Sequence, residues 1–158
     1  MSTSRTVGLI LLLGAAGFSD AAAVPVRAAE DSAALAAAMK DATATLQAGL
    51  KASEREGIPI SAKFEIENGK LQLSVYTMKA DAFSEVVADP QTGVIAKAEK
   101  ITDAEDLKAA TAQKAAMAKA KMTLLMAADT VVKANAGFRA VSIFPELNNG
   151  DANAEVTC

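Results

Sequence analysis

The chain has 158 residues, enough for one ordinary domain or two very small ones. It carries 16 Lys and Arg against 19 Asp and Glu, a formal net charge of −3. Because phosphate binding needs a positive field, this balance argues against nucleic acid as a partner. The absence of histidine removes the commonest general base, the commonest zinc ligand and every Ser–His or Cys–His nucleophile pair. We therefore expect a protein that is not an enzyme, with no catalytic, metal-binding or cofactor-binding residues and no cofactor.

The first residues have the pattern of a secretory signal. An apolar run at residues 7–18 follows Arg5, and small side chains suited to a signal peptidase precede the bonds after Ala23 and Ala28. The run fits the ~7–15-residue core of a signal peptide and is shorter than the ~20 residues that span a bilayer. We expect residues 1–28 to be a signal peptide, with cleavage after Ala28 and Ala23 as the alternative site. An uncleaved anchor is the other interpretation.

Removal of residues 1–28 changes the formal count from 16 − 19 = −3 to 14 − 18 = −4. The expected mature protein is periplasmic or secreted and has no stable membrane span. Its single cysteine, Cys158, excludes an internal disulfide. A free thiol could pair between molecules, but a thiol without a role is the interpretation we favour.

Residues 31–56 have the pattern of one amphipathic helix, with apolar side chains at three- and four-residue spacing. Asp31 or Ser32 could cap its start, and Gly57 with the following Pro59 would end it. The apolar stripe consists of Leu35, Met39, Ala42, Leu46 and Leu50.

Residues 58–67 alternate strictly, which predicts a half-buried strand. Asn68-Gly69 then favours a type I′ turn, because both central residues of that turn need positive φ. The apolar face resumes in a second strand at Leu71, Leu73 and Val75. The predicted inward face of the first strand is Ile58, Ile60, Ala62, Phe64 and Ile66, and the outward face is Pro59, Ser61, Lys63, Glu65 and Glu67.

A second hairpin is predicted from residues 83–88 and 94–98. The segment between them, Asp89 to Gly93, has Asp to open a turn, Pro to fix φ and Gly for the left-handed position. Residues 31–100 thus predict four antiparallel strands with one helix across a face.

Residues 101–158 repeat the beginning of this plan. Thr102 and Glu105 form a capping box for a long Ala-rich helix that runs toward Ala134 and ends at Gly137. Two strands, residues 138–147 and 152–157, flank a turn at residues 148–150.

The two halves are similar in the order of their elements. Residues 46–57 and 64–69 match residues 126–137 and 144–150, with an offset of 80 that becomes 81 at the turn, and Phe64 is matched with Phe144. We interpret this as a tandem duplication whose second copy stops before its third and fourth strands.

This order, with "NGK" in the first hairpin and "VVADPQTGVI" at residues 86–95, resembles the PepSY domain family. The resemblance covers residues 31–100 fully and residues 101–158 as a second, incomplete unit. It implies an α+β fold: a cystatin-like helix packed on an antiparallel sheet, here as a tandem duplication with the second copy truncated. Family members occur in exported proteins and in peptidase propeptides, and an inhibitory or peptidase-regulating role has been proposed for them. No catalytic residues come with the resemblance.

Several polar motifs have simpler structural explanations. Glu65 and Glu67 fit a solvated strand face better than an acid–base pair, and Glu105 and Asp106 fit the favourable start of a helix. The turns at Asn68-Gly69 and at residues 89–93 are explained by backbone geometry without a ligand.

The second predicted helix carries lysines without an intervening acid, at positions 108, 114, 119 and 121. They could dock an acidic partner or an anionic membrane surface, although a polar helix face needs such residues anyway. Methionines 117, 122 and 126 are expected to fill gaps in a core or an interface, since a copper site would need further soft ligands.

The incomplete second unit is the weak part of the predicted fold. A two-stranded hairpin alone is marginal in water, and its outer strand would be an open edge. Either it docks on the first unit or on a second molecule, so that an oligomer could form through this incomplete sheet, or it opens readily. The sequence favours opening in dilute protein.

Taken together, these features predict an exported, non-enzymatic PepSY-like protein that interacts with an envelope protein or modulates a peptidase. The alternative is a small-ligand-binding periplasmic module with a pocket between helix and sheet. The inward faces of the predicted strands carry apolar side chains and no polar groups for such a ligand. A hydrolase is opposed by the absence of histidine.

Overall fold

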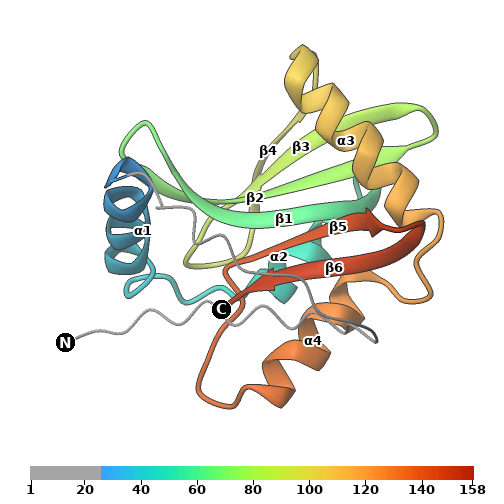
Figure 1. Cartoon of the computed structure of the whole chain (residues 1–158). Helices are drawn as coiled ribbons and strands as arrows, with labels where there is room; N and C mark the ends of the chain where they lie inside the picture. The colour runs from blue at the N-terminus through green and yellow to red at the C-terminus, as the bar shows by residue number, and fades with distance from the viewer. Residues whose placement is uncertain (1–25) are drawn as a thin grey trace.

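The computed structural model describes residues 26–158, and most of the predicted signal peptide lies outside these residues (Figure 1). The described chain forms an α+β fold with one antiparallel sheet in the order β4-β3-β2-β1-β5-β6. None of the helices within this part of the chain is both long and apolar enough to cross a membrane. The elements are α1 (Val26–Ala38), α2 (Leu46–Ser53), β1 (Ile58–Glu67), β2 (Lys70–Lys79), β3 (Ala82–Ala88), β4 (Ile95–Lys100), α3 (Ala104–Met117), α4 (Leu124–Ala134), β5 (Ser142–Asn148) and β6 (Asp151–Thr157).

Each of the two predicted long helices is divided in two, so both predictions of a single helix were wrong. The chain leaves α1 after Ala38, and Thr45 caps α2 by accepting a hydrogen bond from the Ala48 N–H at 3.1 Å. Thr123 caps α4 in the same way, with the Met126 N–H at 3.2 Å. A threonine side chain competes for backbone donors and so favours a helix start over a helix interior.

The start of α3 also differs from the predicted capping box. Asp103, and not Thr102, is the capping residue. Its carboxylate accepts hydrogen bonds from the N–H groups of Glu105 and Asp106, at 2.9 and 3.2 Å. An anionic cap satisfies two free donors and also interacts favourably with the helix dipole.

All six predicted strands are present, with boundary shifts of a few residues at most of them. Both central residues of the first turn, Asn68 and Gly69, have positive φ of 51° and 76°, as a type I′ turn requires. Asn149 and Gly150 repeat this geometry with 51° and 89°. The largest shift is in β5, which begins at Ser142 and leaves the predicted strand residue Phe138 46% exposed.

A bulge in β1 changes the predicted faces of that strand. Its pairing with β2 shifts register between Pro59 and Ser61. Ala62 and Phe64 are buried in the main core as predicted, but Ile60 is buried in a separate cluster and Ile58 is 58% exposed. One extra residue reverses which face the following side chains occupy, and the strict alternation of the sequence conceals it.

The sheet buries side chains on both faces. The main core includes Phe64, Leu73 and Val75 from the sheet, packed against residues of α2 and α4. A smaller cluster joins Ile60, Phe83 and Ile101 to Ala110 of α3, which lies across the sheet in Figure 1. The residues of the predicted first helical stripe all contribute to the main core, although they are divided among α1, the α1–α2 connection and α2: Leu35, Met39, Ala42, Leu46 and Leu50.

The β5–β6 hairpin is docked on the first half of the chain, in place of the opening that the sequence favoured. Ala62 lies opposite Ile143 and Lys63 opposite Ser142, and the Phe64 N–H donates to the Val141 carbonyl at 2.8 Å. The pairing makes the hairpin part of a six-stranded sheet. The reason is that β1 offers an unoccupied edge on the side away from β2.

The position of the second turn corrects one predicted correspondence. The strands before the two turns end at Glu67 and Asn148, and the turn asparagines are Asn68 and Asn149, so both pairs differ by 81. This offset aligns Phe64 with Pro145 and not with Phe144. Phe144 is adjacent to the buried Ile143 and therefore lies on the opposite face.

Candidate functional site

A tight backbone approach borders a hollowed part of the described surface. After α2 the chain turns through residues 54–57 and enters β1 against the end of β2. A Cβ atom on Gly57 would lie 2.7 Å from the Met78 carbonyl oxygen, so only glycine fits there without a shift. Gly57 was predicted to end the helix, but α2 ends at Ser53 with Glu54 as its C-cap residue. Gly57 instead brings Ile58 to the rim between two hollows.

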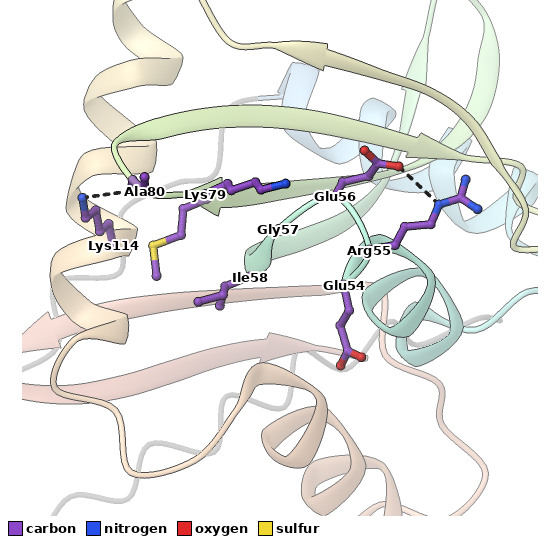
Figure 2. Close-up of a pocket in the computed structure, with 9 residues that line it drawn as sticks. Glu54, Arg55, Glu56, Gly57, Ile58, Lys79, Ala80 and Lys114 are labelled. Atoms are coloured by element: carbon purple, nitrogen blue, oxygen red, sulfur yellow. Dashed lines mark hydrogen bonds and ion pairs between the residues drawn. The ribbon is translucent and has the colours of Figure 1, made fainter.

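Two hollows adjoin at this place and share Glu54, Gly57 and Ile58. The first has a volume of about 530 Å³ and lies between the segment after α2, the β2–β3 turn and α3 (Figure 2). The second has a volume of about 250 Å³ and extends toward the start of α4. We call the two hollows together the Ile58 groove. Its other lining residues are Arg55, Glu56, Met78, Lys79, Ala80 and Lys114 in the first hollow, and Leu50, Pro59, Met117, Thr123, Leu124 and Leu125 in the second.

The rim of the Ile58 groove carries charges of both signs. Lys114 Nζ of α3 lies 2.9 Å from Asp81 Oδ1 in the β2–β3 turn, and this hydrogen bond holds the pKa of Asp81 below its usual value. Arg55 Nε lies 3.3 Å from Glu56 Oε1. Since these pairs are largely exposed, they contribute little to stability and remain available to a partner.

The predicted lysine series lies on α3 and on the α3–α4 connection, and it is partly used within the chain. Lys114 contacts the β2–β3 turn, and Lys119 Nζ donates to the Gly150 carbonyl in the β5–β6 turn at 3.2 Å. These two lysines therefore tie the α3 region to two hairpins. The methionines are also divided: Met117 packs against both core clusters, whereas Met122 and Met126 are exposed and fill no gap in the core.

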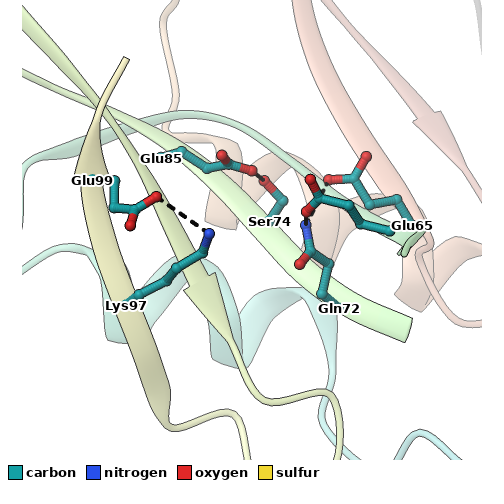
Figure 3. Close-up of polar contacts among 7 residues, drawn as sticks. Glu65, Gln72, Ser74, Glu85, Lys97 and Glu99 are labelled. Carbon is teal, nitrogen blue, oxygen red and sulfur yellow. Dashed lines mark hydrogen bonds and ion pairs between the residues drawn. The ribbon is translucent and has the colours of Figure 1, made fainter. Parts of the chain in front are cut away.

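The predicted outward face of the first hairpin forms a polar network that extends to β3, beside a separate Lys97–Glu99 ion pair within β4 (Figure 3). Gln72 Nε2 donates to Glu65 Oε1 at 3.2 Å and to Glu67 Oε2 at 2.7 Å. Ser74 Oγ donates to Glu85 Oε1 at 2.5 Å. The two strand carboxylates are thus held by a neutral amide on the next strand, as expected for a polar sheet face.

The Asp89–Gly93 turn is explained by its own geometry and by one tertiary contact. Asp89 Oδ1 accepts hydrogen bonds from the N–H groups of Gln91 and Thr92 and from the Thr92 hydroxyl, which hold the pKa of Asp89 below its usual value. The Thr43 hydroxyl donates to the Gln91 carbonyl, and the Ala44 N–H donates to the Pro90 carbonyl at 3.0 Å. The turn therefore fixes the connection between α1 and α2.

Arg139 is a structural residue that sequence reasoning missed. Its guanidinium donates to the Ala42 carbonyl at 2.6 Å and to the Ala44 carbonyl at 2.5 Å, and lies 5.7 Å from the centre of the Phe64 ring. These contacts join the segment before β5 to the α1–α2 connection. No local sequence pattern predicts these contacts, because the hydrogen-bonded partners lie 97 and 95 residues away in the chain.

Tyr76, the only tyrosine, lies under α3 and packs against the small cluster with Ile60. Burial raises the pKa of Tyr76, and the hydrogen-bonded carboxylate of Asp106 raises it further. Asp106, which the sequence assigns to helix-start stabilisation, thus also contacts the sheet. A tyrosine held protonated in this way is unsuited to general base chemistry at neutral pH.

Comparison of the chain with models of known families, with curated proteins and with solved structures found no match. Among residues 26–158, no group of three or more His, Cys, Asp or Glu residues is placed to hold a metal ion. The Ile58 groove is therefore the feature of the described chain from which a function can be argued.

Proposed function

We propose that this chain is an exported, non-catalytic PepSY-like protein that binds an envelope protein through the Ile58 groove and modulates a peptidase. The observation that carries the proposal is Ile58 itself. A branched apolar side chain is 58% exposed at the start of a strand, between two adjoining hollows. An apolar centre within a polar rim is the usual organisation of a protein-binding surface.

The rim supports recognition of a protein more than of a single charged compound. Glu54, Arg55, Glu56 and Lys114 place both signs of charge around one apolar side chain. Such a mixed rim gives orientation and specificity to a partner segment, while the apolar centre supplies most of the affinity.

The order of elements supports the tandem PepSY-like interpretation. Two helices followed by a hairpin with an Asn-Gly turn occur twice along the described chain. The first occurrence continues into a second hairpin, β3–β4, and carries the Asp89–Gly93 turn of the resemblance. We propose that the second occurrence is the incomplete copy.

Affinity capture with the mature protein tests the binding surface. We expect Ile58→Asp to abolish recovery of the partner from an envelope extract, because a buried carboxylate opposes docking. Ile66→Asp is the matched control: Ile66 is 39% exposed and lies at the other end of the same strand. Equal recovery with both variants would exclude the Ile58 groove as the binding surface, and assays of the captured proteins for peptidase activity would test the regulatory part.

Export is tested separately. N-terminal sequencing of the exported protein is expected to give a first residue between Val24 and Glu30, as the small residues after the apolar run predict. Recovery of a chain that still begins near Met1 would contradict cleavage.

A small-ligand-binding module is the second candidate, supported by the hollow of about 530 Å³, a volume within the range of ligand sites. Native mass spectrometry of the protein purified from its compartment distinguishes the two candidates. A retained small molecule that Ile58→Asp removes would favour the ligand module over the protein-binding surface.

A further inference from the structure

We infer that a second copy of this chain pairs with the outer edge of β6, antiparallel and in a single register, to give a symmetric dimer. The inference concerns a different surface from the Ile58 groove and does not depend on the proposed function. It begins from the sheet order, in which β6 is a terminal strand with β5 as its only neighbour among residues 26–158.

The two edges of the sheet differ in how well they are protected against pairing with a further strand. In β4, three of the six residues are charged, and the register with β3 shifts between Val87 and Ala88. Charged side chains and bulges are the usual means of blocking an exposed edge. In β6, only Asp151 and Glu155 are charged, and its pairing with β5 is regular along all seven residues. The β6 edge is therefore the better template for another strand.

The chain already contains one junction of the required kind. Across the β1–β5 junction the edges of two hairpins pair antiparallel, with Ala62 opposite Ile143 and Lys63 opposite Ser142. A β6–β6 junction would join two hairpin edges in the same antiparallel way between two copies, and two identical antiparallel strands are related by a two-fold axis.

Charge and length select one register for that junction. With Ala154 opposite the partner's Ala154, all seven strand residues pair, and Glu155 lies opposite the partner's Asn153. If Asn153 instead of Ala154 lay opposite its own copy, Asp151 would lie opposite the partner's Glu155. If Glu155 lay at that central position, it would lie opposite the partner's Glu155. Both shifts shorten the pairing and bring like charges together, which destabilises a strand pair.

The same register decides the position of the free thiol. Cys158 falls opposite the partner's Gly150, so that the two Cys158 residues lie at opposite ends of the junction and cannot form a disulfide. A single strand pair is smaller than a standard stable interface, and we therefore expect a weak dimer that dissociates on dilution.

Sedimentation of the mature protein over a range of concentrations tests the association. We expect Asn153→Glu to raise the dissociation constant by about tenfold, because each dimer would hold two Glu–Glu pairs, and Asn153→Lys to lower it. Asn153 also lies opposite Glu146 within the hairpin, so thermal melting of each variant at low concentration must show that the monomer remains folded. Gln91→Glu adds the same charge on an exposed turn and should leave the association unchanged.

Cysteine cross-linking tests the register. In a Cys158→Ser background, a mixture of Asn153→Cys and Glu155→Cys is expected to form disulfide dimers several times more readily than either variant alone. Both positions are exposed, so that the substitutions leave the core intact. A protein that stays monomeric at high concentration, equal cross-linking by the single variants, or a Cys158–Cys158 disulfide in the wild-type chain would each overturn the inference.

Discussion

At the scale of single residues, burial separates neighbours that look alike in sequence. Phe64 is almost completely buried, whereas Glu65 on the same strand belongs to the polar network of Figure 3. Ile58 and Ile60 are separated by one residue, but the bulge leaves the first exposed and buries the second under α3. Contacts at this scale therefore decide the energetic cost of a substitution.

Phe64→Ala should destabilise the protein far more than Glu65→Ala. Truncation of a buried phenylalanine costs about 3–5 kcal/mol, and here it also removes the ring beneath Arg139. A change on the polar face usually stays within about 0.5 kcal/mol. Chemical denaturation of the two variants measures the difference, and equal midpoints would show that the strand faces are assigned wrongly.

Tyr76 should give the protein a sensitivity to alkaline pH. Its pKa is raised in the folded state, so the unfolded chain, with a tyrosine pKa near the usual ~10, ionises first. The stability due to the protonated Tyr76 is thus fully present below about pH 10 and is lost as the pH rises through the folded-state pKa. Because the chain has one tyrosine and no tryptophan, tyrosinate absorbance reports this group alone.

The control for this titration is Tyr76→Phe, which removes the ionisation. Between neutral and alkaline pH, this variant should lose less of its free energy of unfolding than the wild-type protein does. Ionisation of folded wild-type protein near pH 10 without loss of structure would contradict the buried hydrogen bond with Asp106.

At the scale of elements, short caps and turns decide where helices begin and strands reverse. Thr45, Asp103 and Thr123 start three helices by accepting hydrogen bonds from backbone N–H groups. Asn68-Gly69 and Asn149-Gly150 reverse two hairpins with positive φ. The turns were evident from the sequence because few residue types adopt that backbone conformation. Two of the caps were missed because threonine is also tolerated within helices.

Asp103→Ala should cost about 1 kcal/mol, whereas Thr102→Ala should be nearly neutral, since Asp103 and not Thr102 caps α3. Denaturant midpoints of the two variants decide between the cap that is present and the one that the sequence suggested. A larger loss of stability for Thr102→Ala than for Asp103→Ala would show that Thr102 caps α3, as the predicted capping box requires.

At the scale of the whole molecule, long-range contacts join the two halves of the chain. The β1–β5 pairing extends the sheet, and Arg139 fastens the segment before β5 to the α1–α2 connection. The hairpin thereby gains a third strand and a packed helix, which is what a two-stranded unit lacks.

Hydrogen exchange of the mature monomer should therefore show comparable protection in β5 and in the β1–β2 hairpin. Arg139→Ala is expected to lower protection in β5 and β6 more than in β2, because the guanidinium joins their side of the sheet to residues 42–44. Arg55→Ala, which removes an exposed ion pair, serves as the control. Fast exchange throughout residues 142–157 of the wild-type protein would show that the hairpin opens.

The sequence by itself determined the α+β class, the six strands, both Asn-Gly turns and most of the core residues from the first half. These follow from local periodicity and from turn residues whose backbone preferences act over a few positions. The helix breaks were within reach of the sequence but were concealed by alanine-rich runs. Only the tertiary structure decided the docking of β5 on β1, the contacts of Arg139 and the exposure of Ile58 in its groove. Each of these depends on groups far apart in the chain or on a one-residue bulge, and a local sequence pattern predicts neither.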